Sequence, residues 1–250
     1  MRLHAVLVLL ISSTALILTS SAQAAFYGDY AGSTVTWVDV QDQNGLFGAP
    51  FASGDSLDFS PNAFEAECSS DPGCPPTPVT VDDTLTLTIQ ANEGSFIDDI
   101  VFSEAGDTTL QSFVDTLAAS VVAATVFVDI FEIDGISVNN INGSIAMVFS
   151  QGGEYRSDDQ GYGTHIWDGS LTIDLDAMIA GAGGTGRATR VQINLDNTLT
   201  AYAAAGATSR IEKKDIDGLA ITVVPEPGTA LLFGLGLAGL AVAGRKEGWG

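Results

Sequence analysis

Apolar and polar side chains alternate at every second position through much of this 250-residue chain. The alternation is clearest at residues 84–90, where Leu85, Leu87 and Ile89 are separated by threonines. Successive side chains of a β-strand point to opposite faces of the sheet. The segment is therefore predicted to be a strand with one face in a core and the other in water, as is common in antiparallel sheets.

Comparable segments recur between clusters of Gly, Asn, Asp and Pro. The predicted strands cover residues 34–40, 56–59, 84–90, 95–103, 121–131, 143–150, 169–176, 189–196, 198–205 and 210–223. In the first strand, Trp37 and Asp39 are expected on one face, with Trp37 in the core, and Val40 on the other face. Short strands with turn signals between them predict an all-β fold, an antiparallel β-sandwich that is jelly-roll-like.

Three segments between these strands carry their own expectations. Gly106 is expected to begin a turn after the strand at 95–103. Residues 60–78, rich in Pro, Cys and Ser, are expected to form a long loop. A helix over residues 113–124 is the alternative to a strand there, although the β-branched residues at 121–131 favour the strand.

The first residues have the composition of an export signal. Arg2 precedes an apolar run at residues 5–18, and a small-residue cleavage site ends at Ala24. Residues 1–24 are therefore predicted to be a signal peptide, and residues 25–222 the sandwich domain. An uncleaved N-terminal anchor is the alternative.

The other end of the chain combines a proline motif, an apolar run and basic residues. The motif consists of Val224, Pro225, Glu226 and Pro227. Its prolines fix φ and remove N–H donors, so the motif is expected to be extended. Residues 229–244 are uncharged and apolar, and a transmembrane helix of roughly 24 Å is predicted there. Arg245 and Lys246 follow, and basic residues favour the cytoplasmic side of a membrane.

This order of features, at residues 223–250, resembles the PEP-CTERM sorting signal of Gram-negative bacteria. The resemblance implies processing by an exosortase near residues 225–227, with a transient stage in the inner membrane. It also implies final placement at the cell surface or outside the cell, and members of the family are often encoded beside exopolysaccharide genes. A plain C-terminal membrane anchor is the alternative.

The formal net charge of the chain is −22. Binding of nucleic acid requires Lys and Arg that neutralise phosphates, so this charge argues against a nucleic-acid partner. Acidic residues are paired at positions 82–83, 98–99, 158–159 and at 174 and 176. Such oxygens can bind calcium, but no EF-hand spacing is present. The alternative is a solvated acidic surface, and no other cofactor or metal is expected.

Cys68 and Cys74 are the only cysteines, and the intervening residues are typical of a turn. In an oxidising compartment they are predicted to form a disulfide. A metal site is disfavoured because His165 is the only histidine outside the predicted signal peptide.

Residues 181–186 satisfy the spacing G-x-G-x-x-G. A dinucleotide site requires a helix after the glycines, but residues 187–196 have the pattern of a strand. A hairpin loop is therefore predicted. No nucleophile with a partnering base is evident either, and we expect the protein not to be an enzyme.

Aromatic and polar residues gather between positions 155 and 168. Tyr155, Tyr162, His165 and Trp167 are candidates for a ligand-binding surface, because the apolar faces of sugar rings stack on aromatic rings. The alternative places Trp167 in the core. The sequence thus predicts an exported surface or matrix protein with a structural or interaction role, and alternatively a carbohydrate-binding module for exopolysaccharide.

Overall fold

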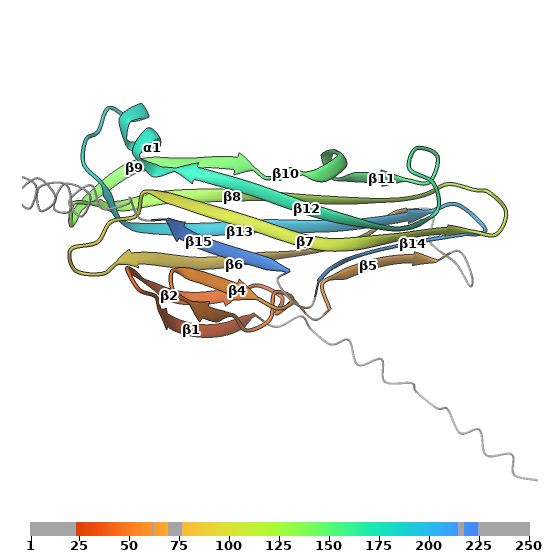
Figure 1. The fold of residues 1–250 in the computed structure, drawn as a ribbon, viewed down its shortest axis with the longest axis horizontal. Helices are drawn as coiled ribbons and strands as arrows, with labels where there is room; N and C mark the ends of the chain where they lie inside the picture. Colours follow the sequence, from red (N-terminus) through yellow and green to blue (C-terminus); the bar gives the residue numbers. More distant parts are fainter. Residues whose placement is uncertain (1–23, 62, 70–76, 215–217, 225–250) are drawn as a thin grey trace, which may run out of the picture.

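The computed structural model describes residues 24–61, 63–69, 77–214 and 218–224. Two antiparallel sheets run along the long axis of an elongated body (Figure 1). The predicted all-β, antiparallel sandwich is thereby confirmed. The finer expectation of a jelly-roll-like order stays a prediction.

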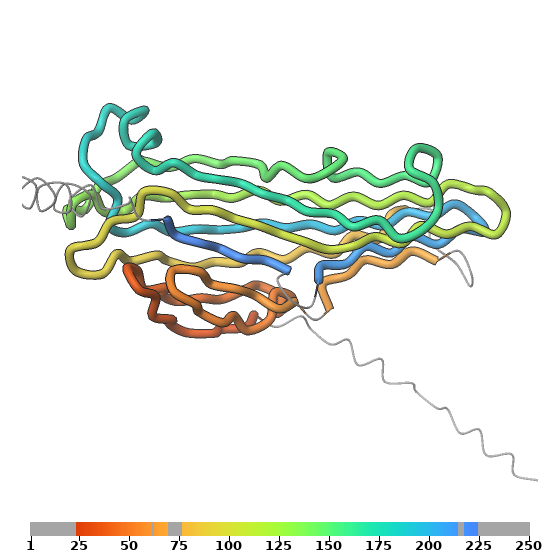
Figure 2. The backbone as a smooth tube through the Cα atoms, viewed as in Figure 1, coloured from red at the N-terminus to blue at the C-terminus, as the bar shows by residue number. Residues whose placement is uncertain are grey.

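Sheet A has seven strands. In spatial order they are β1 (Ala25–Ala31), β2 (Val35–Asp42), β6 (Val79–Ala91), β13 (Ala188–Ala203), β8 (Ala118–Ile133) and β11 (Glu154–Arg156), with β9 (Ile136–Ala146) also paired to β8. The long strands β6, β13 and β8 form its centre, and the tube in Figure 2 shows them extending over most of the body.

Sheet B has eight strands. In spatial order they are β10 (Val148–Phe149), β12 (Gly163–Asp174), β7 (Asp99–Ser112), β15 (Leu219–Val224), β4 (Ser56–Phe59) and β3 (Phe51–Ser53), while β14 (Ala207–Lys213) pairs with both β7 and β5 (Glu65–Ser69). Strands β14 and β15 occupy successive parts of the same edge of β7. The part of the chain that the structure describes also contains two short helices, η1 (Ser150–Gly153) and α1 (Leu175–Gly181).

The core lies between the sheets and follows the predicted alternation. Leu85, Leu87 and Ile89 are fully buried on β6. They pair across the sheet with Leu195, Ile193 and Val191 of β13, which are equally buried. Each such side chain contributes about 1.5–3 kcal/mol through removal of apolar surface from water.

The face expected for Asp39 and Val40 is wrong. Trp37 is buried as expected, but Val40 is also fully buried and Asp39 is exposed. Asp39 has a φ of 54°, and the register with β6 shifts between Val38 and Gln41. This β-bulge adds one residue and therefore exchanges the faces of all residues that follow it.

Gly106 does not begin a turn. It lies within the 14-residue strand β7, opposite Trp167 of β12. A Cβ atom at position 106 would collide with the indole ring of Trp167 and with the backbone oxygen of Glu212. The glycine is thus required inside the strand, because the large ring occupies the space of a side chain.

Several predicted boundaries also differ from the structure. Residues 118–133 form a strand, so the helix alternative is wrong there. Strand β5 lies inside the expected loop 60–78. The separate strands predicted at 189–196 and 198–205 are one strand of 16 residues, and the single strand predicted at 210–223 is divided into β14 and β15.

Helix α1 occupies the end of the strand predicted at 169–176. The Asp174 carboxylate accepts a hydrogen bond of 2.7 Å from the backbone N–H of Ala177 and so caps the helix. The helix precedes the glycine-rich residues 181–186, and strand β13 follows them. The glycines therefore do not open a helix, but the predicted hairpin loop is wrong, because the flanking strands β12 and β13 belong to different sheets.

Both terminal signals fall largely outside the described residues. Nothing is described for positions 1–23 of the predicted signal peptide or for the predicted helix at 229–244. Within the described part of the chain, no helix has the length and apolar character needed to cross a membrane. Cys68 is buried on β5 and carries no free thiol. Cys74 lies outside the described residues, so its pairing with Cys68 stays a prediction.

Candidate functional site

Trp167 is part of the core. The residue has no exposed surface, and its Nε1–H donates to the backbone oxygen of Asp107 at 3.2 Å. Its ring packs edge-to-face with Phe149 at a centroid distance of 6.0 Å. The core alternative for Trp167 is therefore the correct one, and its ring offers no face to a sugar.

The other three residues of the predicted aromatic surface lie in different environments. Tyr155 is only 1% exposed, and its hydroxyl is bonded to Ser150. Tyr162 is 42% exposed and donates to the backbone oxygen of Thr116 at 3.0 Å. His165 is half-buried, with Nε2 3.2 Å from the Gly161 oxygen. The structure does not bring these side chains together on an exposed surface.

The acidic pairs serve separate structural contacts. Arg187 binds Asp98 at 2.5 Å and Arg156 binds Asp158 at 2.9 Å. Asp83 is buried, and its carboxylate accepts hydrogen bonds from the loop that follows β2. Among the described residues, no three His, Cys, Asp or Glu side chains are grouped as a metal site would require. Calcium binding stays an untested expectation.

The loop at residues 43–47 is held by two buried carboxylates. Asp83 accepts hydrogen bonds from the backbone N–H groups of Asn44 at 2.8 Å and Leu46 at 2.9 Å. Asp42 accepts one from Gly45 at 2.8 Å. Burial raises the pKa of Asp83 more than these backbone donors lower it, and the nearby charge of Asp42 adds to the rise. These acids thus fix the loop conformation.

The outward face of sheet A carries a row of polar side chains around an exposed aromatic ring. The row consists, strand by strand, of Gln41, Thr86, Asn194, Phe127 and Ser144. We call these five residues the outer row. They are direct cross-strand neighbours on β2, β6, β13, β8 and β9, and Phe127 is 43% exposed.

Neighbouring contacts fix the geometry of the outer row. The Thr86 hydroxyl donates to Asn194 Oδ1 at 2.8 Å, so the Asn194 amide is oriented and its NH₂ group remains a donor. Beyond the row on β8, Phe131 is 37% exposed and lies under the Arg190 guanidinium at 5.9 Å. The face therefore offers apolar rings beside amides and hydroxyls.

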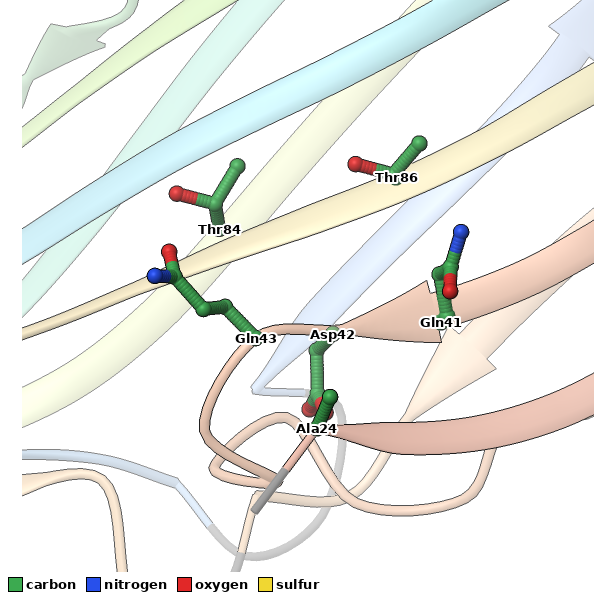
Figure 3. Close-up of a pocket in the computed structure, with 6 residues that line it drawn as sticks. All are labelled: Ala24, Gln41, Asp42, Gln43, Thr84 and Thr86. Carbon is green, nitrogen blue, oxygen red and sulfur yellow. The ribbon is translucent and has the colours of Figure 1, made fainter. Parts of the chain in front are cut away.

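A small depression of about 230 Å³ adjoins the outer row where β2 meets β6 (Figure 3). Its lining consists of Ala24, Gln41, Asp42, Gln43, Thr84 and Thr86. Figure 3 shows Thr84 above the Gln43 side chain and Thr86 farther along the same strand, on the side of Gln41. Amides and hydroxyls of this kind can exchange hydrogen bonds with ligand hydroxyl groups, because each both donates and accepts.

None of the five residues of the outer row was predicted from the sequence as part of a site. A signal was present, because Phe127 lies at an outward position of a strand in which the inward positions are Val126 and Val128. An aromatic residue in the exposed phase of an alternating strand could have been marked as a candidate. Its neighbours Asn194 and Thr86 depend on the register, which only the structure provides.

The described residues thus define an antiparallel β-sandwich with one polar, partly aromatic sheet face. Residues 223–246 match the PEP-CTERM protein-sorting motif. The predicted sorting signal is therefore confirmed. PEP-CTERM signals are exosortase substrates, so the chain is an exported protein directed to the cell envelope or surface.

Comparisons with other proteins add little about the sandwich itself. No curated protein matches the chain in sequence. The structure of TmCBM61 in complex with β-1,4-galactotriose is 11% identical, with a TM-score of 0.21 and coverage of 72% of this chain and 92% of that one. A carbohydrate-binding module of family 29 is 11% identical, with a TM-score of 0.14 and coverage of 73% and 92%. At these TM-scores the likeness supports no conclusion about fold or ligand.

Proposed function

We propose that this chain is a cell-surface or extracellular-matrix protein with a non-enzymatic, structural or interaction role. One observation carries the proposal: the sorting motif begins at Val223, inside the last strand of the sandwich. Val223 is buried, and its N–H donates to the Asp55 oxygen at 2.8 Å. Cleavage near residues 225–227 would therefore release an intact folded body from the membrane-directed tail.

The experiment compares two acids of the tail. Glu226 lies inside the matched motif and Glu247 directly outside it. With Glu226→Gln, we expect the unprocessed chain to accumulate in the inner membrane, whereas Glu247→Gln should be processed like the wild type. Intact mass and membrane fractionation, in cells with and without the exosortase, measure both. Identical processing of the wild type in cells that lack the exosortase would contradict the proposal.

The outer row supports a second candidate function, binding of the cell's exopolysaccharide. The Phe127 ring offers an apolar face on which a sugar ring can stack, and Asn194 and Ser144 lie beside it with groups for sugar hydroxyls. We expect affinity electrophoresis in gels that contain this polysaccharide to retard the wild type, and Phe127→Ala to remove the retardation. Phe113→Ala is the matched control, because Phe113 is 94% exposed and lies in the β7–β8 connection. Equal mobility of the wild type and Phe127→Ala would exclude the outer row as the binding surface.

A further inference from the structure

Three polar side chains that contact one another are buried between the two sheets, at inward positions of strands whose other inward residues are mainly apolar. Glu104 on β7 is 2% exposed, Asn197 on β13 is 0% exposed, and Lys213 at the end of β14 is 3% exposed. The neighbouring inward residues on these strands include Phe102, Leu195 and Ile211. None of the three polar residues belongs to the outer row or to the sorting motif.

One carboxyl group joins the other two side chains. Asn197 Nδ2 donates to Glu104 Oε1 at 2.5 Å, and Lys213 Nζ lies 2.7 Å from Glu104 Oε2. The lysine amine and the asparagine carboxamide are therefore held against the two oxygens of the same carboxyl group. This arrangement joins an amine nucleophile, an acyl group and a proton carrier in one site.

Aromatic rings enclose the amine. The centroids of Phe64, Trp167 and Phe47 lie 5.4 Å, 5.6 Å and 5.8 Å from Lys213 Nζ. All three residues are at most 2% exposed, so they exclude water from the amine. A dry environment protects a newly formed amide against hydrolysis and removes the solvation that an ammonium ion needs.

The environment favours the neutral amine. Lys213 Nζ and Glu104 Oε2 lie 2.7 Å apart, and both side chains are fully buried. Desolvation lowers the pKa of Lys213, although the Glu104 charge opposes this effect. Transfer of one proton from Nζ to the carboxyl group replaces a buried ion pair by two neutral groups. Only the neutral amine has the lone pair needed for attack.

We propose that Lys213 and Asn197 form an intramolecular isopeptide bond, with Glu104 as the catalytic acid and base. The neutral Nζ attacks Asn197 Cγ to give a tetrahedral intermediate. The Glu104 carboxyl group then transfers a proton to Nδ2 while it accepts one from Nζ. The Cγ–Nδ2 bond breaks and one molecule of ammonia leaves. The product is a secondary amide between the two side chains, with Glu104 in its neutral acid form and no net charge in the site.

The bond would connect the two layers of the sandwich. Asn197 belongs to β13 in sheet A, and Lys213 to β14 in sheet B. Separation of the sheets would then require rupture of a covalent bond. Such a connection suits a protein that functions outside the cell, where it cannot be refolded by cytoplasmic chaperones. The inference does not depend on the proposed function, because the bond is detected without reference to location or ligand.

The test is peptide mapping of the folded protein purified from the cells that produce it, whichever fraction contains it. Trypsin does not cleave after an amidated lysine, so the proposal predicts a branched peptide that contains Asn197 and Lys213. Its mass should equal the sum of the two linear segments, with Lys213 uncleaved, minus one ammonia. Fragmentation spectra should place the branch at these residues. Linear peptides with free Asn197 and free Lys213 in the folded wild type would overturn the proposal.

Variants separate the roles of the three residues. Glu104→Gln retains the shape of the side chain but cannot carry the proton, so we expect complete loss of the branched peptide. Lys213→Met removes the nucleophile with the same result. Lys214→Met is the matched control, because Lys214 is the exposed neighbour, and the branch should persist. A branched peptide that persists in Glu104→Gln would refute the role of Glu104, and one that persists in Lys213→Met would refute the link itself.

Discussion

Lys213 Nζ lies 2.7 Å from Glu104 Oε2, and neither side chain has any exposed surface. The two residues come from neighbouring strands, since β14 pairs with β7 and ends opposite Gly106. A buried pair of this kind gains strong mutual attraction but loses the hydration of both groups. Removal of one partner should therefore lower the free energy of unfolding more than replacement of both partners by apolar residues.

Glu104→Ala leaves Lys213 buried without its carboxylate. We expect the free energy of unfolding to fall by about 3–5 kcal/mol, because removal of one partner of a buried pair leaves the other without compensation. The double variant Glu104→Leu, Lys213→Met should be more stable than Glu104→Ala, because it removes the buried amine as well. Urea unfolding measures both. Glu154→Ala is the control, because its contact with Arg156 is exposed and screened by water and should change the free energy of unfolding little.

Gly106→Ala introduces a methyl group into the space of the Trp167 ring. Strand β7 must shift away from β12 or the indole must leave its rotamer, and we expect a loss of about 1–3 kcal/mol. Gly181→Ala is a suitable comparison, because its Cβ would meet no atom within 4 Å. That variant should have unchanged or slightly raised stability. Equal thermal midpoints for the two variants would show that the ring does not require the glycine.

Asp83 should produce a dependence of stability on pH in the acidic range. The pKa of Asp83 in the folded protein is raised above its ordinary value of 3.8, mainly by burial. The folded state thus holds this proton more tightly than the unfolded state does. The stabilising contribution of this proton is fully present below the pKa that Asp83 has in the unfolded state. It is lost as the pH rises through the higher pKa that Asp83 has in the folded state. For Asp83→Asn, the free energy of unfolding should not decrease in this way as the pH rises.

Urea titrations at several pH values from about 3.5 upward measure the difference between the wild type and Asp83→Asn. Asp158 provides the opposite sign, because its contact with Arg156 lowers the pKa of its carboxyl group. Stability from that residue is lost as pH falls, and full exposure keeps the effect small. A wild-type curve parallel to that of Asp83→Asn would contradict the role assigned to burial.

The bulge at Asp39 gives a fourth prediction. Its φ of 54° lies in the left-handed region, which β-branched residues avoid. Asp39→Val should therefore lower the free energy of unfolding by about 1–2 kcal/mol, whereas Asp39→Gly should preserve or raise it. The backbone N–H of Asp39 donates to Asp29, and both substitutions retain this N–H group. Loss of that hydrogen bond therefore does not explain a difference between the wild type and the two variants. Thermal unfolding provides the measurement.

The burial of Glu104 and Asn197 was not predicted from the sequence, for the same physical reason in both cases. The predicted strands end at 103 and are divided at 197, so Glu104 and Asn197 lie at predicted strand boundaries. In the structure both residues continue the inward phase of long strands. A polar residue at an inward position is tolerated only where a partner from another strand satisfies it. That partner lies 93 residues away for Asn197 and Glu104, beyond the reach of local patterns.

The sequence alone determined the all-β class, the sorting motif at residues 223–246 and the buried phase of strands such as 84–90. These follow from local properties: side-chain alternation, proline geometry and a run of uncharged residues. Only the tertiary structure decided that Trp167 is core, that Phe127 stands beside Asn194, and that Lys213 meets Glu104. Register and sheet packing set those contacts, and both depend on strands that are distant in the chain.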